Sequence, residues 1–325
     1  TLSRLGWAFQ LWSPDDHGVW GLGGGIIWVI GAAMVLMAVL VFLPTSAVAA
    51  FGVAVIAFHN LLDTKTAADL QLPQVVWGVL HAGGGEVVPG VTFGAGYGLL
   101  PCLGIMAAGY GLGALYLLEP GARRRQLLGL GLMLTALFVV LRYSNLYGDP
   151  TPARPPVTAA VAAGVGGGIT AVGPNPSVPG PWSVREPWYF TIFSFLNCQK
   201  YPASLLYILM TLGPSITFLG LFEGARGPVA RFFVVFGRVP LFFYLLHIPL
   251  IHGLAVGLDY LRFRESPMAT DGCWSVAGKQ VPPDYGVSLP VVYLVWMAVV
   301  LLLYPLCWWY AGVKQRYRWA WLSYL

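Results

Sequence analysis

The sequence contains few charged residues for its length. Only 10% of its 325 residues are Asp, Glu, Lys or Arg, whereas soluble domains contain about 25%. Hydrophobic residues make up 57% of the chain, and the mean hydropathy is +0.71. This composition excludes an ordinary soluble domain and predicts a polytopic membrane protein. The net charge of +5 is typical of a membrane protein with basic cytoplasmic loops, so it implies no nucleic acid partner.

Motifs for metal, redox and phosphate chemistry are also missing. The four cysteines form no Cys-x-x-Cys pair and no metal-type spacing with histidine, so we expect no metal. The glycine stretches at 21–25 and 94–98 are expected to lack the strand and helix that flank a phosphate loop. Cys198 and Cys273 fall in two different outer loops, where a disulfide is chemically permitted. Pairing and two free thiols both remain open.

Long apolar runs predict an all-α bundle of seven transmembrane helices. Each run has about 20 residues, with Leu, Ala, Gly and Val on every face, which excludes amphipathic helices and alternating barrel strands. Pro214, Pro240 and Pro249 interrupt some of them, as lipid-embedded helices tolerate. The expected spans are 22–42, 45–62, 97–118, 126–146, 202–222, 231–258 and 288–310.

The positions of Lys and Arg predict the orientation. Residues 119–125, residues 223–231 and the C-terminal tail are basic, so we expect them in the cytoplasm. The loops 63–96, 147–201 and 260–287 then lie outside, and we expect 147–201 to be irregular because 151–187 is rich in Pro and Gly. Residues 1–21 also fall outside and the first residue is Thr, so we expect an N-terminally incomplete chain.

Eight polar side chains lie inside or at the ends of these apolar runs. A charge in hydrocarbon is costly, so such residues normally face a protein interior or a wet cavity and mark function. Six are expected at outer helix ends and two in the outer half of one span, so we expect them to meet. They are His59, Asp63, Arg142, Asn145, Asp149, Lys200, His247 and His252.

Two of these groups have helical spacing. His59 and Asp63 are four residues apart and share a helix face, where the carboxylate can hold the imidazole as a general base. A polar helix end among headgroups is the alternative. Arg142, Asn145 and Asp149 follow at spacings of three and four, either as a binding site or as a structural ion pair.

Two further groups point to binding. Lys200 and Tyr201 precede Pro202, a residue suited to the first turn of a helix, so Lys200 is expected beside an anion-binding helix N-terminus. Snorkelling to headgroups is the alternative. On the span 231–258, two histidines that flank Pro249 favour a working site. The residues of interest there are Arg238, Tyr244, His247 and His252. A phosphate-bearing ligand on the cytoplasmic side would suit the arginines, which are Arg231, Arg238 and Arg123 to Arg125.

Five stretches resemble the bacterial membrane family related to heparan-alpha-glucosaminide N-acetyltransferase. They are LLPCLGIMAAGYGLG, RYSNLYGDP, SFLNCQKYPASLLYILMTLGP, GRVPLFFYLLHIPLIH and YGVSLPVVYLVWMAVVLLLYPLC. The resemblance implies a single transmembrane acyltransferase-like domain over 1–325 in the bacterial inner membrane, with a cytoplasmic C-terminus. It also implies acetyl-CoA as the cytoplasmic donor, a sugar or glycan outside as the acceptor, and a histidine as acetyl acceptor or base.

The resemblance also implies roles for particular residues, and the neighbouring residues extend the set. We expect His59, Asp63 and His247 to be catalytic. We expect substrate or cofactor binding by Arg142, Asn145, Lys200, Tyr201, Arg238, Tyr244 and His252.

The family's principal histidine belongs to spans that precede this sequence, which leaves a second hypothesis open. In that hypothesis the chain is a non-catalytic subunit of a larger membrane assembly. Membrane lipids and a homo-oligomer or larger assembly are the expected partners. A transporter is a weaker alternative, because no repeat of paired broken helices is found.

Overall fold

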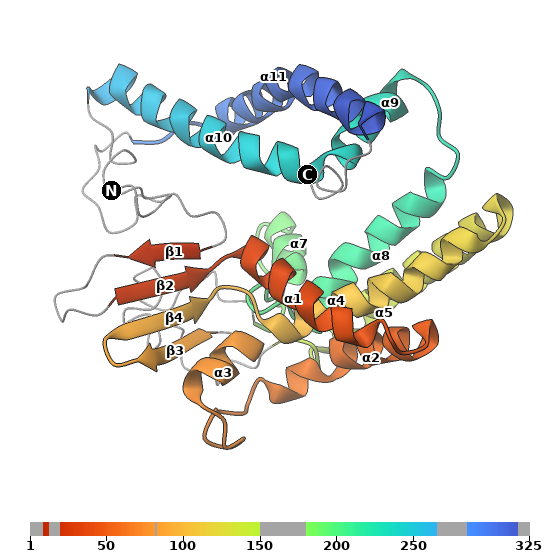
Figure 1. Cartoon of the computed structure of the whole chain (residues 1–325), viewed down its shortest axis with the longest axis vertical. Helices are drawn as coiled ribbons and strands as arrows, with labels where there is room; N and C mark the ends of the chain where they lie inside the picture. The colour runs from red at the N-terminus through yellow and green to blue at the C-terminus, as the bar shows by residue number, and fades with distance from the viewer. Residues whose placement is uncertain (1–8, 13–19, 82, 150–179, 265–284, 318–325) are drawn as a thin grey trace. The chain divides into compact units, whose positions relative to one another are not determined.

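The computed structural model describes residues 9–12, 20–81, 83–149, 180–264 and 285–317 (Figure 1). The chain forms two units, Leu2–Glu223 and Gly224–Leu325. Both are mostly helical, which confirms the fold prediction in its coarse form. The single domain over 1–325 stays a prediction.

Among the described residues, five helices are long and apolar enough to cross a membrane by length and composition. Two further apolar helices are shorter, with 15 and 17 residues. A 15-residue helix is about 22 Å long, less than the roughly 30 Å of a hydrocarbon core. The chain thus has the helices of a multi-pass membrane protein, but the count of seven spans is not confirmed. The long helices are Thr45–Leu62, Leu99–Leu117, Pro120–Ser144, Pro240–Phe263 and Leu289–Arg316, and the shorter ones are Ile26–Leu40 and Leu205–Leu221.

The first unit contains a four-stranded sheet that the sequence analysis did not predict. The strands lie in the order β1-β2-β4-β3, with β2 and β4 parallel and the outer pairs antiparallel. Helix α3, Gln74–Leu80, packs on β3 and β4 (Figure 1). Residues 63–96 are therefore more than a loop. The strands are β1 Phe9–Trp12, β2 Trp20–Gly24, β3 Gly83–Val88 and β4 Val91–Ala95.

Two of these strands lead directly into helices. β2 is followed by α1, Ile26–Leu40, and β4 by α4, Leu99–Leu112. The expectation that the glycine stretches lack a flanking strand and helix is therefore wrong. Neither stretch completes the G-x-G-x-x-G phosphate pattern, because Ile26 and Leu99 stand where its third glycine belongs.

The first unit also contains two closely packed helix pairs. α2, Thr45–Phe58, packs on α4, and α5, Pro120–Ser144, packs on α8, Leu205–Leu221. A Cβ atom on Gly52 would lie 2.3 Å from the backbone nitrogen of Ala108, and one on Gly131 would lie 2.4 Å from that of Thr217. Only glycine allows such close approach of two backbones.

Three shorter elements complete the first unit and position its polar residues. The 3-10 helix η2, His59–Leu62, extends α2, and η3, Gly113–Leu117, extends α4. α7, Tyr189–Leu196, precedes α8.

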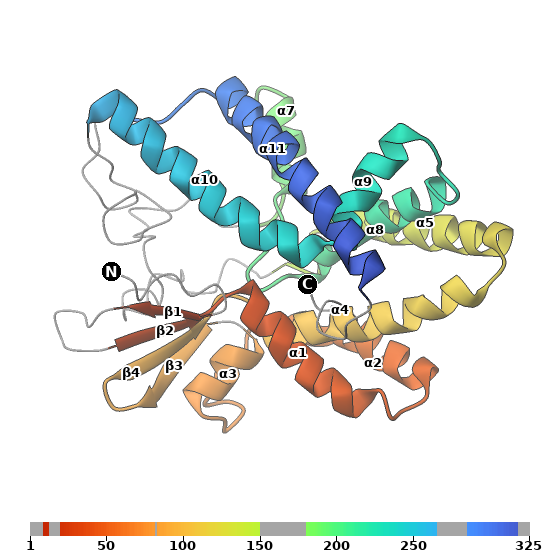
Figure 2. The same ribbon diagram turned by 45° about the horizontal axis from the view of Figure 1, so that its top comes forward.

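The described residues of the second unit form α9, Pro228–Arg238, α10, Pro240–Phe263, and α11, Leu289–Arg316. The expected continuous span 231–258 is wrong, because Val239 separates α9 from α10 with φ −134° and ψ 49°. Pro240 cannot donate a helical hydrogen bond and disfavours helical geometry in the residue before it. α10 and α11 lie side by side (Figure 2).

Candidate functional site

The polar residues of the first unit gather where η2, the end of α3 and the start of α8 meet. Asp63, the C-cap residue of η2, is at the centre, and its side chain is 8% exposed. Its Oδ1 lies 2.7 Å from Nε2 of His81, and its Oδ2 accepts a hydrogen bond from Nδ2 of Asn60 at 2.8 Å. The site thus contains a buried carboxylate–imidazole pair.

His81 is a candidate site residue that the sequence pattern did not reveal. Its side chain is completely buried and stacks on Trp77, with ring centroids 5.0 Å apart. Because the carboxylate of Asp63 accepts a hydrogen bond, the proton of the neutral ring belongs on Nε2. Nδ1 then carries a lone pair, and it has no hydrogen-bond partner among the described residues. Such an oriented ring nitrogen can accept a proton.

The spacing predicted that Asp63 holds the ring of His59, but His59 has different neighbours. Its Nδ1 lies 3.1 Å and 3.0 Å from the carbonyl oxygens of Val55 and Ile56, and its Nε2 lies 2.9 Å from the carbonyl oxygen of Ala203. Carbonyl oxygens accept hydrogen bonds and cannot donate them. Both ring nitrogens of His59 can therefore donate at the same time only when the ring is protonated as the imidazolium. In this geometry His59 ties α2 to the start of α8 and presents no lone pair to a substrate.

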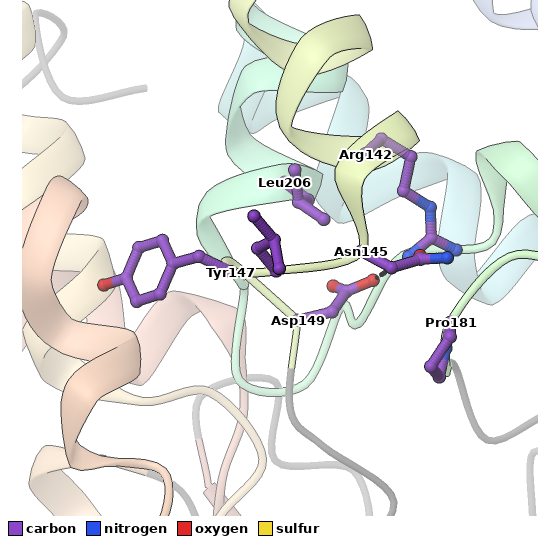
Figure 3. A pocket seen from close by; sticks show the side chains of 7 residues that line it. Arg142, Asn145, Tyr147, Asp149, Pro181 and Leu206 are labelled. Atoms are coloured by element: carbon purple, nitrogen blue, oxygen red, sulfur yellow. Dashed lines mark hydrogen bonds and ion pairs between the residues drawn. The ribbon is translucent and has the colours of Figure 1, made fainter.

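Arg142 and Asp149 form a second buried pair (Figure 3). Arg142 is 1% exposed, and its Nη1 donates to Oδ2 of Asp149 at 2.6 Å. Its Nε and Nη2 donate to four main-chain carbonyl oxygens at 2.9–3.2 Å, three of them at the end of α7, where the helix dipole favours a cation. The geometry favours the structural alternative for this pair. The four carbonyls belong to Gly180, Ser194, Phe195 and Asn197.

The start of α8 joins the two pairs into one network. Ser204 caps α8 and donates its hydroxyl to Oδ1 of Asp149 at 2.7 Å, while the N–H of Leu205 donates to Oδ1 of Asn60 at 2.8 Å. Burial raises the pKa of the Asp149 carboxyl, whereas the hydrogen bonds from Ser204 and the Gln199 N–H and the charge of Arg142 oppose that rise. The side chains of both carboxylates are thus fixed by neighbours far away in the sequence.

The residues expected just before α8 lie in a turn. The helix begins at Leu205, so the prediction that Pro202 starts it is wrong. Lys200 lies with Nζ 4.9 Å from the ring centroid of Tyr201, and a hydrogen bond to Tyr201 raises the pKa of Lys200. The hydroxyl of Tyr201 lies 3.3 Å from that of Tyr97.

Asn145 forms hydrogen bonds to main-chain groups of Trp182. Its Oδ1 accepts a hydrogen bond from the N–H of Trp182 at 3.1 Å, and its Nδ2 donates to the carbonyl oxygen of the same residue at 3.3 Å.

A small cavity lies beside Arg142 and Asp149 (Figure 3). Its volume is about 40 Å³. A water molecule needs at least about 10–15 Å³, and ligand pockets measure about 300–1,000 Å³. The cavity therefore suits a few water molecules and not a sugar or a coenzyme. It is lined by Arg142, Asn145, Leu146, Tyr147, Asp149, Pro181 and Leu206.

The remaining predicted residues, Arg238, Tyr244, His247 and His252, lie in the second unit. Nδ1 of His247 lies 3.0 Å from the carbonyl oxygen of Phe243, and the two rings stack with centroids 5.0 Å apart. The ring of Tyr244 is 5.5 Å from that of His247, as their spacing predicts. Their meeting with the residues of the first unit stays a prediction.

Two further predictions concern cysteine and metal. Burial raises the pKa of the Cys198 thiol to about 12. Cys273 lies outside the described residues, and with it the disulfide prediction. Within the described ranges, no group of three His, Cys, Asp or Glu residues is placed to hold a metal ion.

Comparison with known proteins assigns no family. The chain matches no protein-family model, no curated protein and no solved structure. The resemblance to the acyltransferase family therefore rests on the five sequence stretches alone.

Proposed function

We propose that the chain is a multi-pass protein of the bacterial inner membrane that transfers an acetyl or similar acyl group. The donor is a cytoplasmic acyl-CoA and the acceptor a sugar or glycan on the periplasmic side, with the C-terminus in the cytoplasm. The observation that supports this proposal is the Asp63–His81 pair, whose imidazole keeps one ring nitrogen without a partner among the described residues. The five family-like stretches supply the reaction class.

In this proposal His81 is the general base. Asp63 holds the Nε2–H and stabilises the imidazolium that forms during the reaction. The acceptor nitrogen or oxygen attacks the thioester carbonyl carbon while Nδ1 takes its proton. The carbon–sulfur bond then breaks, and the CoA thiolate leaves with that proton from Nδ1. Because Nδ1 is enclosed, a local opening must admit the acceptor, as in active sites that exclude water.

A second candidate is a non-catalytic subunit of a larger membrane assembly. The geometry of Arg142 favours it, because its donors are taken up by Asp149 and by main-chain carbonyls, and the adjoining cavity holds only water-sized molecules. In this alternative the polar network holds helices together and performs no chemistry.

The experiment that separates these candidates measures transfer of labelled acetyl from acetyl-CoA to glucosamine by the full-length protein in proteoliposomes. His81→Gln is the informative variant, because the glutamine amide nitrogen can still donate to Asp63 but no base remains. We expect its rate to fall by at least about 100-fold with an unchanged unfolding temperature.

If the His81→Gln variant transfers acetyl at the wild-type rate, His81 is not the general base. Absence of transfer by the complete wild-type protein with a range of acyl donors and acceptors would refute the enzyme and favour the subunit. His247→Gln, in the second unit, tests separately whether the predicted second histidine contributes.

A further inference from the structure

Helix α9 of the second unit presents two arginines on one face. Arg231 and Arg238 are seven residues apart, which is about two helical turns, and both are exposed. α9 packs on α11 through Val235 and Tyr310. Val235 is four residues after Arg231 and three before Arg238, so the basic row borders the packed side of α9 and stays exposed.

An exposed apolar row lies on another side of α9. Val229 and Phe233 are four residues apart and are 71% and 66% exposed. Each is two residues from Arg231, which is about 200° around the helix, so this row lies opposite the basic one. α9 has 11 residues, so it is about 16 Å long and too short to cross a hydrocarbon core of about 30 Å. A short helix with exposed arginines on one side and exposed Phe and Val on the other is typical of helices that lie in the membrane interface.

Further positive charge lies near the end of α9. Nζ of Lys314 donates to the carbonyl oxygen of Arg238 at 3.3 Å, which places the end of α11, with Arg316, beside it. Asp259 is the one carboxylate among residues 224–264 and 285–317, and it lies about 28 Å along α10 from Pro240. The described part of this unit thus has no carboxylate close to the arginine row.

We propose that α9 lies in the headgroup layer and binds an anionic phospholipid through Arg231 and Arg238. A guanidinium group donates two parallel hydrogen bonds to a phosphate, and Arg231 and Arg238 offer two such groups. The exposed side chains of Phe233 and Val229, on the opposite side of α9, fit the acyl-chain region of the membrane. Coenzyme A or inorganic phosphate matches the charge but leaves these apolar side chains in water.

The test is a titration of the full-length protein, in neutral detergent, with dioleoyl phosphatidylglycerol, followed by native mass spectrometry. The variant Arg231→Gln/Arg238→Gln is compared with Arg124→Gln/Arg125→Gln, which removes two exposed arginines at the start of α5. We expect the α9 variant to bind about 25-fold more weakly at low salt, or about fivefold for each arginine. We expect the α5 variant to bind like the wild type, and dioleoyl phosphatidylcholine to bind weakly to all three.

Three outcomes would overturn the proposal. One is an equal loss in the α5 variant, which would mean that total charge and not α9 attracts the lipid. Another is equal affinity for phosphatidylcholine and phosphatidylglycerol. The third is complete displacement of the lipid by coenzyme A or inorganic phosphate at equal concentration, which would assign the arginines to a soluble ligand. If the double variant does not fold, Arg231→Gln alone is the test, with an expected loss of about fivefold.

Discussion

Replacement of Arg142 by methionine is expected to destabilise the first unit strongly. Methionine is similar in length but has no hydrogen-bond donor, so the carboxylate of Asp149 becomes a buried charge without its cation. Four main-chain carbonyls lose their donor at the same time. The long connection before α8 then loses the side chain that ties it to α5.

The magnitude follows from burial and from the number of contacts. Removal of one partner of a buried ion pair costs about 3–5 kcal/mol. The adjacent cavity of about 40 Å³ can admit water to some of the orphaned groups, so we expect the lower end, about 3 kcal/mol. That loss lowers the ratio of folded to unfolded protein by more than about 100-fold.

The assay is reversible unfolding in mixed micelles with increasing sodium dodecyl sulfate, followed by tryptophan fluorescence. A double-mutant cycle adds Asp149→Asn, which removes the charge but keeps an oxygen facing Ser204. We expect Arg142→Met/Asp149→Asn to be more stable than the sum of the two losses predicts, by about 1–3 kcal/mol. A loss below about 1 kcal/mol for Arg142→Met, or strict additivity, would refute the reasoning.

Three further predictions concern packing, a thiol and a surface ion pair. Gly131→Ala should lower the free energy of unfolding by about 1–3 kcal/mol, because its Cβ meets the backbone of α8. Gly129→Ala, on the same helix with open space around it, is the control and should be neutral or stabilising. The Cys198 thiol stays protonated until the pH approaches its pKa of about 12, so maleimide should label it poorly near pH 8, and rapid labelling in the folded protein would contradict this. Arg123→Gln should barely move the unfolding midpoint, because the pair with Glu223 is accessible to solvent, and a large downward shift would contradict that interpretation.

Local composition was enough to predict the long apolar helices. An apolar run must satisfy its backbone groups internally, and runs such as 289–316 have few residues that interrupt a helix. The break at Val239 was missed because hydropathy continues across it while Pro240 stops the hydrogen bonding. The sheet was missed because it pairs β2 with β4, far away in the sequence, through glycine-rich segments without alternating polarity.

The candidate site was only partly predictable for a similar reason. Spacing selected Asp63 as a candidate but paired it with His59, four residues away. The actual contact is with His81, which is brought back by α3 from a segment expected to be an outer loop. The sequence signal for His81 was weak, since the residue merely follows the apolar segment 75–80. Sequence spacing alone cannot predict such a long-range contact.

The most direct test of the account is the protonation state of the histidine rings. Solid-state NMR of the nitrogen-15-histidine-labelled, full-length protein in bilayers measures it, with His81→Gln used to assign the signal. At about pH 8, the account predicts a proton on Nε2 of His81 and none on Nδ1. A proton on Nδ1 at that pH would remove the proposed base and contradict the central claim.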